Sequence, residues 1–259
     1  SPMPSLKIIL LSILILCSSF SQTDEYIFRQ LTDADGLSQS TIFAMIQDRD
    51  GYLWLGTIDG LNRYDGYEFR VYANDPSDDA SISDNFISAL YEDSNGIIWI
   101  GTVNGYLNSF EKKKEDFKKY YINDFFSRTN NPDANFYVYS LAFSRNQINT
   151  ITAITEDKDG YLWIGTWGNG LVKFDKKKNK GIQYYSDPDN QLSLSSNRII
   201  DILSDRNDDI WIATFGGGLN KLVQNNNSKM EEINFLRYRS NERNKSTLSD
   251  DKTISLFED

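Results

Sequence analysis

The sequence predicts an all-β protein, a β-propeller of four-stranded antiparallel blades, and three observations support this prediction. A tryptophan-centred unit occurs four times in the 259 residues, with spacings of 45, 64 and 48 residues between successive tryptophans. Aromatic residues make up 14% of the chain and β-branched residues are common, a composition that favours strands. Glycine and aspartate turns divide each unit into four short segments, which is typical of propeller blades.

Each unit has the same internal spacing. An aspartate stands six residues before each tryptophan, and an isoleucine stands six residues before each aspartate. Another apolar residue lies midway between the isoleucine and the aspartate. The tryptophans are Trp54, Trp99, Trp163 and Trp211; the aspartates are Asp48, Asp93, Asp157 and Asp205; the isoleucines are Ile42, Ile87, Ile151 and Ile199; the midway residues are Met45, Leu90, Ile154 and Ile202. We expect strand a to end at the aspartate, and strand b, apolar at nearly every position, to bury its tryptophan. Strand c follows a glycine turn, and an aromatic and basic strand d completes the blade.

The units predict blades near residues 41–74, 86–122, 150–186 and 198–240. The final stretch "TLSDDKTISLFED" repeats the start of a unit, with Asp259 at the position of Asp48. A fifth blade is therefore expected to begin near residue 252, so that the propeller is incomplete in this chain. The segment "YIFRQLTDADGLSQSTI" before the first blade has the pattern of a strand d with its exit loop. Residues 22–259 are thus predicted to be the N-terminal part of a larger propeller domain.

Residues 1–21 are predicted to be a signal peptide. Lys7 precedes an apolar run from residue 8 to 16, which is too short for a membrane span, and small residues favour cleavage before Gln22. Lipidation of Cys17, the single cysteine, is the alternative. Export predicts a periplasmic location and a domain that packing, rather than disulfides, must stabilise.

Two sets of glycines have different physical reasons. The first set closes the turn between strands b and c, where a positive φ is expected: Gly60, Gly105, Gly170 and Gly218. The second set lies in strand b and includes one alanine, which argues against a positive φ: Gly56, Gly101, Gly165 and Ala213. At these four positions we expect small size to permit close packing between blades.

The unit D-x-x-G-x-[LI]-W-[LI]-G-T-x-x-G resembles the two-component regulator propeller repeat, which occurs in the periplasmic sensor region of hybrid two-component system histidine kinases. The resemblance covers about residues 26–259, with departures at Asp209, Ala213 and Asn146. It implies a longer protein, with a transmembrane helix and a cytoplasmic histidine kinase. It also implies a ligand-sensing role, in many such sensors toward oligosaccharides, and a homodimer formed through the full periplasmic region.

Composition argues against several activities. The chain has no histidine, so it contains neither a Ser-His-Asp nor a Cys-His catalytic system and is not the kinase part. Its net charge of −10 argues against a nucleic-acid partner. The aspartate-rich turns lack the late glutamate of a calcium loop and are interpreted as Asx turns. We predict no catalytic residue, no metal site and no cofactor.

The candidate ligand-binding residues lie in the turns between strands b and c, named here the b–c turns. Hydrogen bonds to hydroxyls are assigned to Asp59, Asn104 and Asn169, and stacking on a sugar ring to Trp167 and Phe215. Packing between neighbouring blades is the alternative role for Trp167. The extra residues 123–150, rich in aromatic residues and arginine, are expected on the same face.

The sequence therefore favours a periplasmic ligand-sensing propeller of a two-component signalling protein, most plausibly one that recognises oligosaccharides. Two alternatives remain open. A secreted propeller enzyme acting on glycans, a hydrolase or lyase, would need a distinct carboxylate pair. A propeller scaffold for protein–protein contact would need no such site.

Overall fold

The computed structural model describes residues 29–125, 149–224 and 233–259. The chain divides into two compact units, Ser1–Leu31 and Thr32–Asp259. In the first unit only residues 29–31 are described, and none of them is in a helix or strand. The predicted signal peptide and Cys17 therefore lie outside the described residues. All the sheets belong to the second unit.

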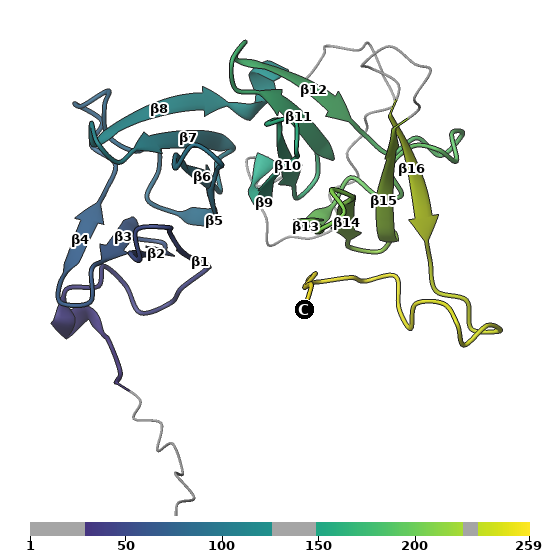
Figure 1. Ribbon diagram of the computed structural model, residues 1–259, viewed down its shortest axis with the longest axis horizontal. Helices are drawn as coiled ribbons and strands as arrows, with labels where there is room; N and C mark the ends of the chain where they lie inside the picture. Colours follow the sequence, from purple (N-terminus) through teal and green to yellow (C-terminus); the bar gives the residue numbers. More distant parts are fainter. Residues whose placement is uncertain (1–28, 126–148, 225–232) are drawn as a thin grey trace, which may run out of the picture. The chain divides into compact units, whose positions relative to one another are not determined.

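Four sheets follow one another along the second unit (Figure 1). The first contains β1 (Ala44–Gln47), β2 (Leu53–Gly56), β3 (Leu61–Tyr64) and β4 (Phe69–Tyr72). The second contains β5 (Ile87–Glu92), β6 (Ile98–Thr102), β7 (Tyr106–Glu111) and β8 (Asp116–Tyr121). The third contains β9 (Ile151–Glu156), β10 (Leu162–Thr166), β11 (Leu171–Asp175) and β12 (Lys180–Tyr184). The fourth contains β13 (Ile199–Ser204), β14 (Ile210–Thr214), β15 (Gly218–Gln224) and β16 (Ile233–Tyr238).

Within each sheet the strands pair antiparallel in chain order, and the first strands of neighbouring sheets, such as β5 and β9, contact each other. The predicted β-propeller of four-stranded antiparallel blades is confirmed. In the described ranges, helix is limited to 3-10 geometry: η1 (Asp33–Asp35), η2 (Ile122–Phe125) and the single residue Asn149. No described helix has the length and apolar character that crossing a bilayer requires.

The spacing of aspartate and tryptophan follows from the hairpin between strands a and b. Asp48 Oδ1 accepts hydrogen bonds from the backbone N–H groups of Asp50 and Tyr52, both at 3.0 Å, while its Oδ2 accepts one from Trp54 Nε1 at 2.8 Å. The same indole bond links Asp93 to Trp99, Asp157 to Trp163 and Asp205 to Trp211. One carboxylate oxygen thus holds the turn and the other holds the tryptophan, which confirms the interpretation as Asx turns.

The tryptophans lie between neighbouring sheets. Trp54 and Trp163 are fully buried and Trp99 nearly so. Trp54 packs edge-on against Phe110 of the second blade, with ring centroids 5.5 Å apart. Trp211 is half-buried, so the expectation of four buried tryptophans is wrong for the fourth copy. Trp54 is covered by Phe110, which lies in strand c of the following blade. Among the described residues, no strand c of a following blade lies beside Trp211.

Both glycine predictions are confirmed. The glycines of the b–c turns have φ values of +121°, +86°, +74° and +74° in the order Gly60, Gly105, Gly170 and Gly218. The strand b glycines, in contrast, face the first isoleucine of the next blade. A Cβ there would lie 2.5–2.6 Å from an isoleucine Cγ2, in the pairs Gly56–Ile87, Gly101–Ile151 and Gly165–Ile199. The repeated glycine and isoleucine therefore form one contact between adjacent blades.

The last residues of the chain lie against the fourth blade. Thr253 N donates to Thr214 O at 3.2 Å, just as Ile87 N donates to Thr57 O at 2.9 Å between the first and second blades. Leu256 N donates to Asp201 Oδ2 at 2.8 Å. Residues 253–259 are not assigned to a strand.

The N-terminal segment matches its prediction only in part. Residues 29–32, in the predicted strand d, are not in a strand, and residues 26–28 lie outside the described ranges. The exit loop is as expected, because Ser38 N donates to Asn62 Oδ1 at 2.8 Å. Two later blades repeat this bond, between Ser83 and Asn108 and between Ser195 and Asn220.

Lysines link neighbouring blades at the opposite end from the b–c turns. Lys112 of the second blade lies 3.1 Å from Asp48 Oδ2 of the first blade and 3.0 Å from Glu92 Oε1. In the same way Lys176 lies 2.7 Å from Asp93 Oδ2 and also pairs with Glu156. Burial alone raises the pKa of the Asp93 carboxyl, but the hydrogen bonds from Lys176 and the Trp99 indole outweigh it and lower that pKa below its usual 3.8.

This link predicts a loss of stability in acid. Because the pKa of Asp93 is lowered by folding, its contribution is fully present above the usual value of 3.8 and is lost as the pH falls through the lower folded value. We expect Lys176→Met to destabilise the protein at neutral pH and to flatten this acid dependence. Urea unfolding followed from pH ~7 to ~3 measures both effects. The control is Lys177→Met, at an exposed position in the same turn; identical curves for the two variants would contradict the prediction.

Candidate functional site

The b–c turns are held by the threonine that ends or follows each strand b. Thr57 Oγ1 donates to the carbonyl oxygen of Gly60 at 3.0 Å, and Thr166 and Thr214 make the equivalent bonds to Gly170 and Gly218 at 2.8 Å. These bonds fix both ends of the turn. Side chains between the threonine and the glycine are presented on this end of the blades.

Trp167 and Phe215, from the turns of the third and fourth blades, lie together. Their ring centroids are 5.7 Å apart with an angle of 47° between the planes, and both side chains are half-buried. The backbone N–H of each aromatic residue donates to the residue just before the first strand of its own blade. Trp167 N donates to Thr150 O at 3.0 Å, and Phe215 N donates to Arg198 O at 2.9 Å. The two rings therefore form one aromatic surface across the seam between the third and fourth blades, and this contact is the packing role considered for Trp167.

A cation borders this surface. Lys252 Nζ lies 5.6 Å from the centroid of the Phe215 ring, within the range of a cation–π interaction. Lys252 is bridged to Phe215 through the backbone, so the C-terminal segment places the ammonium group beside the aromatic pair.

The three polar residues predicted for this face have different surroundings. Asp59 is exposed, and its backbone N–H is held by Thr57 Oγ1 at 3.0 Å. Asn104 accepts a hydrogen bond from Thr102 Oγ1 at 2.7 Å. Asn169 donates through Nδ2 to Asn149 Oδ1, and Gln183 Nε2 donates to its carbonyl oxygen at 2.8 Å. The two asparagine side chains thus hold turns in place, and Asp59 presents an exposed carboxylate.

Both described ends of the extra segment are attached to the b–c turn of the second blade. Ile122 N donates to Gly105 O at 3.0 Å, and Thr150 Oγ1 donates to Val103 O at 3.0 Å. Residues 126–148 lie outside the described ranges, and with them most of the aromatic residues and the arginines of this segment. The segment therefore leaves and rejoins the sheets at the end that carries Asn104.

A second aromatic pair lies at this end and was not predicted. Phe43 and Phe86 have ring centroids 4.8 Å apart, and Phe43 is 50% exposed. Phe86 O accepts the backbone N–H of Val103 at 3.2 Å, which places the pair beside the b–c turn of the second blade. Each phenylalanine breaks the repeat: Phe43 stands where the other units have Ser88, Thr152 and Ile200, and Phe86 where they have Thr41, Thr150 and Arg198. That break was the available sequence signal.

The class of protein is defined by these observations: a β-propeller built from tryptophan repeats, with aromatic pairs on the face of its b–c turns. The model of the two-component regulator propeller family matches residues 36–59, 81–104, 147–168 and 193–216, one match for each blade. The chain therefore carries two-component regulator propeller repeats, and the resemblance seen in the sequence is confirmed.

Similar proteins include a histidine kinase and the extracellular domains of a two-component and a one-component system. Histidine kinase P4 of Formosa agariphila is 45% identical over 76 residues, 29% of this chain and 6% of that protein. The extracellular domain of a hybrid two component system from B. thetaiotaomicron is 25% identical, with a TM-score of 0.60 over 82% of this chain and 26% of that one. The extracellular domain of a one component system from B. thetaiotaomicron is also 25% identical, with a TM-score of 0.55 over 82% and 23%. This chain spans about a quarter of those solved domains.

Proposed function

We propose that this chain is the ligand-sensing part of a two-component signalling protein, located in the periplasm, that recognises an oligosaccharide. Residues 1–21 direct its export, and the full-length protein carries the signal through the inner membrane to a histidine kinase, as a homodimer. The family match and the similarity to extracellular sensor domains support this proposal.

The aromatic surface of Trp167 and Phe215 is the observation that carries the binding role. Two half-buried rings at the end of paired strands, inclined by 47° to each other, offer an apolar surface with little conformational entropy to lose. The C–H face of a pyranose packs on such a surface, and the exposed Asp59 carboxylate is an acceptor for sugar hydroxyls. Lys252, 5.6 Å from the Phe215 ring, is a donor to the same hydroxyls.

We expect Trp167→Ala to weaken oligosaccharide binding at least ~10-fold, equal to about 1.4 kcal/mol. Calorimetric titration of the complete extracytoplasmic region with neutral and acidic oligosaccharides provides the measurement, with product formation followed in parallel. The matched control is Tyr67→Ala, because Tyr67 is an aromatic residue 91% exposed in the turn between strands c and d, at the other end of the blade. Equal affinity of Trp167→Ala and the wild type removes this face from the proposal, and turnover of the sugar replaces the sensor with an enzyme.

A further inference from the structure

The outer strand of the third blade breaks the repeat at one position. In the other three blades, strand d carries a phenylalanine that pairs with a residue near the end of strand c: Phe69, Phe117 and Phe235. At the same place the third blade has Gly181, which pairs with Phe174. In the second blade the repeat phenylalanine contacts its strand c partner, since the rings of Phe110 and Phe117 lie 4.6 Å apart. The glycine leaves this place in the third blade open.

Phe125, from the preceding blade, occupies the open place. Its ring lies 5.1 Å from that of Phe174, and a Cβ on Gly181 would lie 2.7 Å from the Cβ of Phe125. The segment η2 therefore reaches from the end of β8 to β12 and joins the outer rims of two blades. Only a residue without a side chain at position 181 permits this contact.

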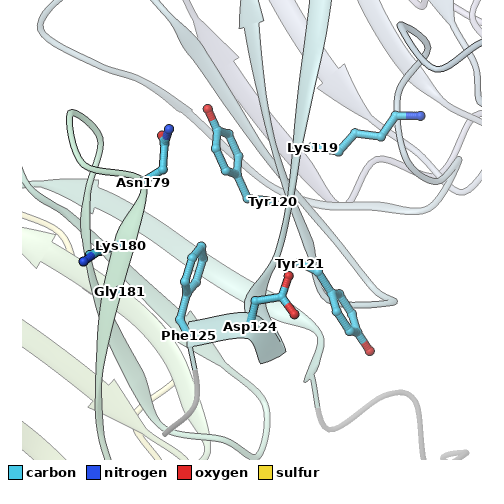
Figure 2. A pocket seen from close by; sticks show the side chains of 8 residues that line it. All are labelled: Lys119, Tyr120, Tyr121, Asp124, Phe125, Asn179, Lys180 and Gly181. Carbon is cyan, nitrogen blue, oxygen red and sulfur yellow. The ribbon is translucent and has the colours of Figure 1, made fainter.

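A hollow of about 520 Å³ lies where the two rims meet, within the size range of small-molecule sites. We name it the rim hollow; its lining residues are Lys119, Tyr120, Tyr121, Asp124, Phe125, Asn179, Lys180 and Gly181. Figure 2 shows the rings of Tyr120 and Phe125 directed toward the strand of Gly181 and the turn of Asn179, while the Lys119 side chain extends away. Tyr120 is braced from behind by Phe174, with ring centroids 5.3 Å apart.

The rim hollow is lined by two lysines as well as by an amide and a carboxylate, but the Lys119 side chain extends away from it (Figure 2). Asn179 is exposed at the tip of the β11–β12 turn, with a φ of +53° that asparagine tolerates better than most residues. Asp124 adds an exposed carboxylate from η2. Lys180 precedes Gly181 in β12, and alternation along a strand directs its side chain to the opposite face. Aromatic rings beside an amide and a carboxylate suit a polyhydroxyl ligand without negative charge.

We infer that the rim hollow is a second oligosaccharide subsite, specific for neutral sugars, separate from the face of the b–c turns. The ligand class rests on the proposed function; the location rests on the geometry of Tyr120, Phe125 and Asn179. A pyranose stacks against the rings of Tyr120 and Phe125, and its hydroxyls bond to the Asn179 amide and the Asp124 carboxylate. Sugars that carry carboxylate or sulfate groups are disfavoured by Asp124.

The test is titration of the complete extracytoplasmic region with cellohexaose, maltohexaose and laminarihexaose, and with a hyaluronan hexasaccharide as the acidic comparison. Asn179→Gly keeps the left-handed backbone and removes the amide, and Asp124→Ala removes the exposed carboxylate. Each is expected to weaken binding of a neutral hexasaccharide at least ~10-fold. The matched control is Glu115→Gly, because Glu115 has a φ of +54° at the same turn position one blade earlier and pairs with Arg70 instead.

The outcomes separate this inference from the proposed function. Neutral-sugar binding that both rim variants retain, but Trp167→Ala loses, overturns the rim hollow and leaves the proposed sensor intact. Preference of the rim hollow for the hyaluronan hexasaccharide also overturns the inference. Absence of binding for every oligosaccharide overturns the proposed ligand class together with this subsite.

Discussion

Replacement of Trp163 by alanine is expected to destabilise the protein by about 3–5 kcal/mol. The indole is fully buried in the cluster that joins the third and fourth blades, which also contains Leu222 and Phe235. Its removal leaves a large cavity, and Asp157 Oδ2 loses the indole N–H that it accepts at 2.8 Å. A buried carboxylate oxygen that loses this donor adds to the cost of the cavity.

The same substitution at Trp211 provides the control. Trp211 makes the same indole bond, to Asp205 at 2.9 Å, but its ring is half-buried and packs mainly on Tyr238 and beneath Lys221. Trp211→Ala is therefore expected to cost about half as much, roughly 1.5–2.5 kcal/mol. Urea unfolding followed by far-ultraviolet circular dichroism compares the two variants without depending on tryptophan fluorescence. Equal losses would show that burial between blades does not set the energy of the repeat tryptophan.

The repeating part of the fold was predictable because each repeated residue has one local task. The aspartate holds a turn and accepts its own tryptophan six residues later, so the spacing alone predicts a hairpin. The strand b glycine was assigned to packing because Ala213 replaces it once, and the distance from Gly101 to Ile151 agrees with that reason.

Features that depend on distant partners were not predictable from one unit. Trp211 follows the repeat pattern, yet its burial depends on the strand that covers it from the next blade. Phe125 replaces a phenylalanine missing at Gly181 in another blade, and the sequence shows only the glycine and the missing aromatic residue.

At the candidate site, too, some features were predictable from the sequence and others were not. Trp167 and Phe215 were selected because equivalent turns carry both, and their rings contact each other. Phe43 and Phe86 meet from different blades, so neither residue alone indicates a pair. The amide chemistry of Asn104 and Asn169 suggests ligand binding, but their hydrogen bonds to Thr102 and Asn149 follow from the turn geometry, which composition does not show.

Gly101→Ala is the second substitution with a large expected effect, a loss of about 1–3 kcal/mol from one added methyl group. The new Cβ would lie 2.5 Å from Cγ2 and 2.8 Å from Cβ of Ile151, a fully buried side chain of the next blade, and 3.1 Å from Cβ of Ala89. Ile151 is β-branched and in a strand, so it has few rotamers with which to avoid the contact. The sheets themselves must therefore move apart.

Ile151→Ala tests whether that contact is the cause. Alone it should cost about 2–5 kcal/mol through the cavity that it creates, but in the double variant part of the Gly101→Ala cost should disappear, with a coupling of ~1 kcal/mol or more by a double-mutant cycle. Ala213→Gly is the control, because the fourth blade already has alanine there and the repeat places Thr253, not isoleucine, opposite it. That change should cost only about 0.5–1 kcal/mol, from backbone entropy. Strict additivity of Gly101→Ala and Ile151→Ala in urea unfolding would show that glycine is required here for a reason other than the approach of the neighbouring blade.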